Sequence, residues 1–228
     1  MKLKEATEKL YNVFGKYYVE GNIRERSCHC CVSNEDIKEL LSKPLRKLEE
    51  KDLKHFMFSA ISTFGDVQDY KHFLPRILEL MQNEECEFID DFIIFEKLNY
   101  SEWETWDLLE IETIESYFLS LWTHLLSDEK TSFRQLNSML EIISKYVGLN
   151  KALTIWDMYC SNQSVLFIVD FIWNSNQFIN DEKTDKLYYW FSTSSIKDKI
   201  QNLFFTTEDK YLASKLSIVY TIIENYKT

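Results

Sequence analysis

The sequence predicts an all-α protein of stacked antiparallel helix pairs, either an irregular bundle or a short HEAT-like superhelix. The 228 residues include only 4 glycines and 2 prolines, which leaves few of the tight turns that a sandwich or barrel needs. Apolar residues recur at spacings of three and four along most of the chain, as amphipathic helices require. Hydrophobic residues make up 45%, enough for a sizeable core. We therefore expect one helical domain over residues 1–228.

Apolar periodicity and turn residues together bound the expected helices. Ser33 and Asp36 have capping-box spacing, Gly65 and Gly148 are expected to follow helix ends, and Pro75 predicts a kink or two short helices meeting at 74–75. The expected helices cover residues 3–19, 34–41, 50–64, 67–81, 88–98, 107–126, 131–147, 151–159, 165–173, 182–191, 195–205 and 207–226. Some of their starts are spaced as in HEAT repeats, but no residue pattern repeats.

The chain shows neither a signal peptide nor a membrane span. Its first residues mix both charges, and a signal peptide requires an apolar stretch. The apolar run 165–173 contains Asp170 and is too short to cross a bilayer. We expect a cytoplasmic protein that does not bind membranes and keeps its five cysteines reduced.

The net charge of −11 is confined to one segment, residues 84–115, which holds twelve acidic residues and one basic residue, Lys97. The remaining acids and bases balance. Nucleic-acid binding is not expected, because phosphate neutralisation requires a basic surface. The segment also contains Tyr100, Trp103 and Trp106, and acids around aromatic residues can steer and anchor a basic protein. The predicted docking residues are Tyr100, Trp103, Glu104, Trp106 and Asp107. Alternatively, these aromatic residues face the core.

Cys28-x-x-Cys31 is a pair with metal-ligand spacing. On the expected helix over 67–81, Asp69, His72 and Arg76 share a face, so His72 is a candidate third ligand. The predicted metal ligands are thus Cys28, Cys31 and His72, with zinc as the possible cofactor. His29, His55 or Cys86 are other candidates to complete the site. Structural cysteines, a redox dithiol, and an Asp69–His72 contact with Arg76 reaching a neighbouring helix are the alternatives.

The stretch 28–80 also resembles a family of uncharacterised bacterial cytosolic helical proteins. The shared order is C-x-x-C, then P-L-R-x-L, then G-D-V-x-D-Y-K-H-F-L-P-R-x-L-E-L. The resemblance implies a bacterial source and no particular reaction. The matching positions are Cys28, Cys31, Pro44, Leu45, Arg46, Thr63, Gly65, Asp66, Asp69, His72, Phe73, Leu74, Pro75 and Arg76.

The leading functional hypothesis is a protein-interaction module whose acidic, Trp-containing surface binds a basic protein, for example as an immunity or antitoxin-like protein. The alternative is a zinc-binding protein or hydrolase that uses Cys28, Cys31 and His72. A structural subunit of an obligate oligomer is a third hypothesis. No phosphate-binding glycine loop, nucleophile elbow or H-E-x-x-H motif occurs in the sequence, so an enzyme is the less favoured class.

Overall fold

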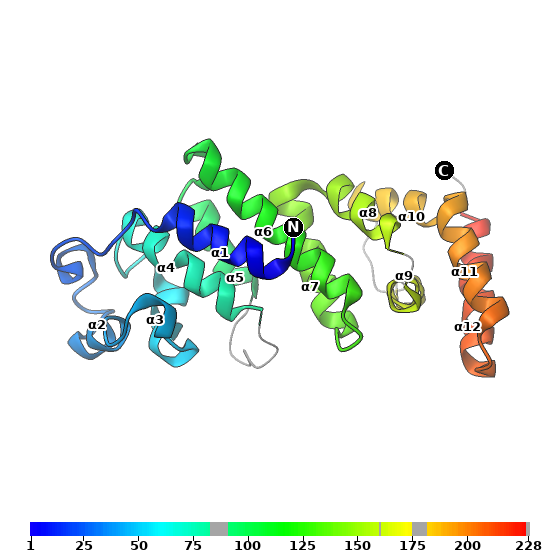
Figure 1. Cartoon of the computed structure of the whole chain (residues 1–228), viewed down its shortest axis with the longest axis horizontal. Coiled ribbons are helices and arrows are strands. Elements are labelled where there is room, and N and C mark those ends of the chain that lie inside the picture. The colour runs from blue at the N-terminus through cyan, green and yellow to red at the C-terminus, as the bar shows by residue number, and fades with distance from the viewer. Residues whose placement is uncertain (83–90, 160, 175–181, 227–228) are drawn as a thin grey trace. The chain divides into compact units, whose positions relative to one another are not determined.

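The computed structural model describes residues 1–82, 91–159, 161–174 and 182–226, and most of these residues lie in helices (Figure 1). The predicted all-α class is confirmed. Across the described ranges, β-structure is limited to an isolated bridge between Ala60 and Phe64. None of the described helices combines the length and the apolar content needed to cross a bilayer.

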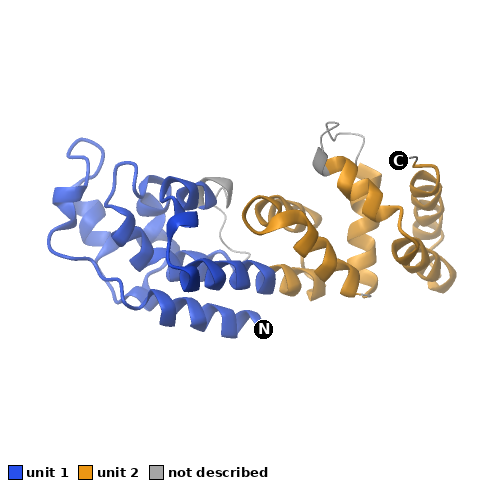
Figure 2. Cartoon of the chain, turned by 90° about the horizontal axis from the view of Figure 1, so that it is seen from above, with its two compact units in different colours: residues 1–121 blue, residues 122–228 orange. Residues whose placement is uncertain are grey.

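The chain divides into two compact units, residues 1–121 and 122–228 (Figure 2). The expectation of one domain over residues 1–228 stays a prediction. The helices are α1 (Leu3–Phe14), α2 (Asn34–Leu40), α3 (Glu50–Ser59), α4 (Val67–Leu80), α5 (Asp91–Tyr100), α6 (Leu108–Ser127), α7 (Phe133–Ile143), α8 (Leu149–Met158), α9 (Asn162–Asn174), α10 (Glu182–Phe191), α11 (Ser194–Thr206) and α12 (Lys210–Glu224). Short 3-10 turns lie at Ile23–Arg26, Leu45–Lys47 and Trp103–Thr105, and a π-turn at Ser144–Gly148.

The first unit is built around α4. Helices α1 and α3 pack against α4, and α3 also contacts α2 and α5. Leu10 and Phe14 of α1 and Phe73, Leu74 and Ile77 of α4 are buried. Burial of these apolar side chains supplies the main force that holds the helices together.

Helix α4 runs without interruption through Pro75, so the prediction of two short helices meeting at 74–75 is wrong. A proline inside a helix removes one backbone hydrogen bond. Leu74 and Ile77, on either side of Pro75, are fully buried, and burying one such side chain contributes about 1.5–3 kcal/mol. Apolar burial on both sides of the proline therefore outweighs the lost hydrogen bond.

Helix α3 ends earlier than predicted, at Ser59 rather than at Phe64. The chain leaves the helix at Ala60 and passes through Ile61, whose φ of 70° is left-handed. Phe64 then returns to the core, with its ring centroid 5.3 Å from that of Phe56. The five residues 60–64, which the apolar periodicity predicted to be helical, thus form a turn. This turn places the Thr63 carbonyl next to the Cys28 amide.

The second unit contains its own core. Helix α9 packs against α7, α11 and α12, and α11 packs against α12. Trp122 and Trp156 are fully buried and meet edge to face, with ring centroids 5.4 Å apart. Their indole N–H groups donate to the carbonyls of Ala152 (3.0 Å) and Ser164 (3.1 Å). Most of α9 is buried, as its sequence predicts.

Candidate functional site

Residues 27–33 form a surface loop, here called the thiol loop, between the 3-10 turn Ile23–Arg26 and α2. Its far end is fixed by the predicted capping box, in which the Asp36 amide donates to Ser33 Oγ (3.1 Å) and the Ser33 amide donates to Asp36 Oδ2 (2.6 Å). Val32, just before this cap, is buried. The loop therefore enters α2 in one defined direction.

The first two residues of the thiol loop are tied to the chain around Gly65. The Cys28 amide donates to the Thr63 carbonyl (2.8 Å), and the Gly65 amide donates to Ser27 Oγ (3.1 Å). Gly65 has a φ of +68°, and a Cβ there would lie 2.7 Å from Asp69 Oδ2. The position thus requires glycine for its backbone conformation and for the close approach of the carboxylate.

Arg26 links the start of the loop to α4. Its guanidinium donates to both carboxylate oxygens of Asp69, at 2.9 and 2.7 Å, and to the Glu20 carbonyl at 2.8 Å. Asp69 is buried and also accepts the Asp66 amide (3.0 Å). Bidentate pairs of this kind fix orientation as well as distance.

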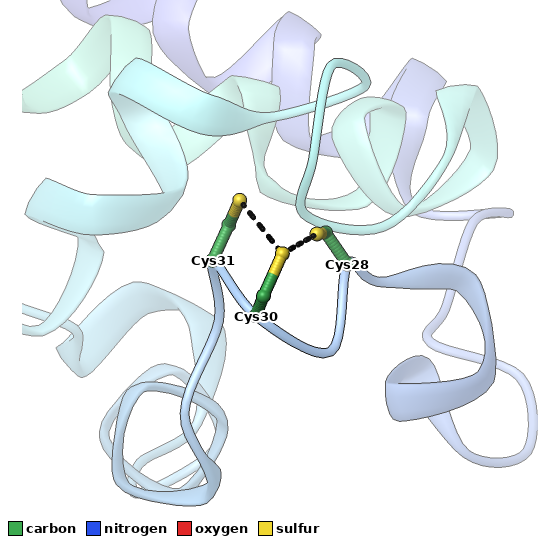
Figure 3. A group of neighbouring side chains, drawn as sticks. All are labelled: Cys28, Cys30 and Cys31. Carbon is green, nitrogen blue, oxygen red and sulfur yellow. Dashed lines mark hydrogen bonds between the residues drawn. The ribbon is translucent and has the colours of Figure 1, made fainter.

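Three thiols converge on this anchored loop (Figure 3). Cys30 Sγ lies 3.1 Å from Cys28 Sγ and 3.7 Å from Cys31 Sγ, and all three sulfurs lie within 4.8 Å of one another. Cys30 and Cys31 are exposed, and Cys28 is partly exposed. We call Cys28, Cys30 and Cys31 the thiol cluster.

Cys28 and Cys31 differ in acidity because of the hydrogen bonds within the thiol cluster. Hydrogen bonds from the Cys30 and Cys31 thiols lower the pKa of Cys28 to about 7. The same sharing raises the pKa of Cys31 to about 11, with Cys28 as the first cause. At neutral pH the cluster therefore already holds part of one negative charge, on Cys28.

The structure places His72 outside the thiol cluster. In the part of the chain that the structure describes, Cys28, Cys30 and Cys31 form the only group of at least three histidine, cysteine or acidic ligands at metal-binding distances. His72 Nδ1 lies 2.9 Å from the Tyr17 carbonyl. The structure thus brings Cys30, and not His72, next to Cys28 and Cys31. Metal binding by these residues stays a prediction. Cys86 lies outside the described residues.

The other members of the polar helix face have structural partners too. Asp69 binds Arg26 rather than His72. Arg76 Nε donates to the Leu48 carbonyl (2.7 Å), so Arg76 does reach a neighbouring element. The imidazole of His55 contacts Asp36 Oδ1 at 3.0 Å, and His29 is exposed without belonging to the thiol cluster.

The predicted docking residues separate into buried and exposed groups. Trp103 and Trp106 have only 4% and 9% of their surface exposed, so neither can anchor a partner directly. Tyr100, Glu104 and Asp107 are exposed. Asp107 pairs with Lys16 at 2.8 Å. Part of the acidic segment, residues 84–90, lies outside the described residues.

Trp106 is buried because it belongs to an ionic network that the sequence did not indicate. Its indole N–H donates to the Ser101 carbonyl (3.0 Å), and Lys71 Nζ lies 4.1 Å from its ring centroid. Lys71 Nζ also donates to Glu110 Oε2 (2.7 Å), and Glu110 is completely buried. Glu110 is one of the twelve acids of segment 84–115, and it pairs with a buried lysine.

Comparison with protein-family models, with curated proteins and with solved structures gives no match. The resemblance carried by Cys28, Cys31 and the residues around His72 therefore stays a prediction. What the site does has to be inferred from its own side chains.

Proposed function

We propose that the protein binds a thiophilic metal ion, Zn²⁺ in the first instance, through the thiol cluster. The observation that carries the proposal is the convergence of three sulfurs within 4.8 Å on one anchored loop. Thiolates are soft ligands that favour zinc and similar ions. Tetrahedral zinc with bonds of about 2.3 Å separates its sulfur ligands by about 3.8 Å.

In the structure, one of the two sulfur separations is near that value and the other is shorter. The Cys30–Cys31 sulfur distance is 3.7 Å and the Cys28–Cys30 distance is 3.1 Å, so adjustments of side-chain torsions suffice to admit an ion. The backbone of the loop does not need to move, because its anchors at Thr63, Gly65 and Asp69 involve no thiol. A fourth ligand position faces solvent, since Cys30 and Cys31 are exposed.

Competition titration of Zn²⁺ against a chromogenic chelator tests the proposal. The protein carries Cys86→Ser and Cys160→Ser throughout, so that thiols elsewhere in the chain do not contribute. We expect one Zn²⁺ per chain, and an affinity at least tenfold weaker after Cys28→Ser, Cys30→Ser or Cys31→Ser. Loss of a ligand removes a metal–sulfur bond, and binding also releases protons from the thiols.

His72→Gln is the matched control, because it keeps a polar side chain at the position predicted from sequence. It should leave zinc affinity unchanged. An affinity that falls with His72→Gln and not with Cys30→Ser would overturn this ligand set in favour of the sequence-based one. Protein that binds no zinc would overturn the function itself.

A second proposal is protein docking, in a form altered by the burial of the tryptophans. Tyr100, Leu108 and Leu109 are 62%, 70% and 54% exposed, which is unusual for large apolar side chains. Exposed acids, including Glu102 and Glu104, lie in the same ten residues. A surface that combines apolar anchors with acids suits a basic protein, such as the effector of an immunity-like pair.

Affinity capture from a bacterial lysate at increasing salt tests the docking surface. The double variant Tyr100→Ala/Leu108→Ser should lose a protein that wild-type chain retains at low salt. Leu41→Ser, which changes an exposed leucine on α2, is the control and should retain it. An identical set of retained proteins for all three chains would sink the docking proposal.

A further inference from the structure

The second unit contains a groove between α8 and α10 that neither proposal uses. Its volume is about 920 Å³, within the range of small-molecule sites. The lining residues of α8, among them Asn150, Asp157 and Met158, are spaced by seven and eight positions and therefore share one helix face. On α10, Asp185 and Tyr189 are four positions apart and also share one helix face. Tyr226 belongs to the lining as well.

Aromatic rings make up much of this lining. Tyr189 is 62% exposed, so it is available to a ligand. Trp190 packs against Trp156 with ring centroids 5.3 Å apart. Tyr226 is stacked on Tyr188 at 5.1 Å with an interplanar angle of 28°. These contacts fix two of the three rings in place, so little ordering remains to be done when a ligand enters.

Carboxylates lie on both walls of the groove. Asp157 of α8 accepts hydrogen bonds from Ser195 Oγ and Lys199 Nζ, both at 2.8 Å, which neutralise it. Asp185 of α10 is exposed and accepts a long hydrogen bond, 3.4 Å, from the Tyr226 hydroxyl. Asp185 thus places a negative charge beside a ring.

Aromatic faces next to a carboxylate match one class of ligand. The negative face of an aromatic ring attracts ammonium groups, and alkylated ammonium ions lose little hydration on binding. A neutral ligand would cover the carboxylate without compensating its charge, which is costly. An anion would be repelled by the Asp185 carboxylate. Lys186 also lines the groove and follows Asp185 in the chain.

We propose that the α8–α10 groove binds an organic cation of the alkylammonium class, with the rings of Tyr189, Trp190 and Tyr226 around the cation and Asp185 as its counter-ion. Met158 packs against the alkyl part. The proposal involves residues of the second unit alone. It stands or falls independently of the thiol cluster.

Binding of choline, compared with its neutral isostere 3,3-dimethylbutan-1-ol, tests the charge requirement. Both are titrated into the full chain and followed by protein NMR, using the indole N–H signals. We expect choline to bind at least tenfold more tightly than the alcohol. Equal affinity for the two probes, or no shift of any indole signal with choline, would overturn the proposal.

Substitutions then locate the site. Asp185→Asn should weaken choline binding about fivefold to tenfold and leave the alcohol unaffected, and Tyr189→Leu should weaken choline binding as well. Both residues are exposed, so the variants are expected to fold, which circular dichroism checks. Tyr211→Leu, at an exposed tyrosine of α12 that does not line the groove, is the control. Unchanged choline affinity in folded Asp185→Asn would contradict the assignment.

Discussion

The thiol loop and the segment 100–109 lie in the same unit and use their side chains in opposite ways. Cysteine is among the residues most often buried, yet Cys30 and Cys31 are exposed. Trp103 and Trp106 are the large aromatic residues of the other segment, and both are buried. In the thiol loop the anchors are backbone groups and the side chains of Ser27 and Arg26. In segment 100–109 the indole of Trp106 is itself an anchor.

The comparison shows which side chains are available for function. A residue that holds its own segment in place cannot also bind a partner without loosening that segment. The thiols hold nothing in place, so their convergence calls for an explanation outside packing. The buried tryptophans already have such an explanation. Within segment 100–109 the exposed large hydrophobic side chains are Tyr100, Leu108 and Leu109.

The largest expected effect tests the structural role of Trp106. Replacing Trp106 by alanine should lower the free energy of unfolding by about 3–5 kcal/mol, because a large buried side chain leaves a cavity. Tyr100→Ala, at an exposed position nearby, should change it by less than about 0.5 kcal/mol. Urea unfolding followed by circular dichroism measures both. Similar losses in the two variants would remove the contrast between buried and exposed aromatics.

A smaller effect is expected at Glu110. Burial raises the pKa of Glu110, but hydrogen bonds from Lys16, Lys71 and Tyr17 outweigh it, so the net pKa is lowered. The stability that this carboxylate contributes is therefore complete above its unfolded-state pKa of about 4.3. It is lost as the pH falls through the lower folded-state pKa.

Glu110→Gln should accordingly cost about 3 kcal/mol at pH 7, because Lys71 keeps its charge and loses its partner. The variant should also lose less stability than wild type between pH 5 and pH 3. Urea midpoints measured across that range give both quantities. Glu112→Gln, at an exposed position of the same helix, is the control, and an equal pH dependence in all three proteins would contradict the role given to Glu110.

The smallest effect concerns reactivity rather than stability. With the pKa of Cys28 at about 7, its alkylation by iodoacetamide in metal-free protein should rise with pH and reach half its maximal rate near pH 7. Cys30→Ala removes the hydrogen bond that is the first cause of the lowered pKa, so the Cys28 pKa should return toward its ordinary value of about 8.5. Alkylation at pH 7 should then be about tenfold slower.

Peptide mapping by mass spectrometry assigns the alkylation rate to Cys28. Cys31→Ala, which removes the second cause, should slow the reaction less than Cys30→Ala does. A pH profile that is the same in wild type and in Cys30→Ala would show that the thiols do not share hydrogen bonds in solution.

Local patterns in the sequence predicted the helices well wherever one element decides the outcome. The bounds of α10, Glu182–Phe191, agree with the prediction, and the capping box of Ser33 forms as expected. Disagreements arise where distant segments compete with local preference. Pro75 stays within a helix because of core burial, and α3 stops at Ser59 because the turn 60–64 returns Phe64 to the core.

The candidate site was only partly predictable for the same reason. Spacing identified Cys28 and Cys31, but spacing favours ligands three or four positions apart and passed over Cys30, which the loop turns toward both. His72 was predicted as a ligand from its position on a helix face, but that position does not show which segment packs against the face. In the structure, His72 Nδ1 contacts the Tyr17 carbonyl. Likewise, only the fold shows that Lys71 and Glu110 meet beside Trp106.

The hydrogen bonds from Cys28 to Thr63 and from Gly65 to Ser27 have one more consequence. They join residues 27–28 to residues 63–65, which are far apart in the chain. The amides of Cys28 and Gly65 can therefore exchange with deuterium only when these two segments separate. A ligand held by the thiols would favour the closed state by mass action. Gly65 lies outside the thiol cluster, but its amide is bonded to Ser27 of the thiol loop. Slower hydrogen exchange at the Gly65 amide would then report that the cluster holds a ligand.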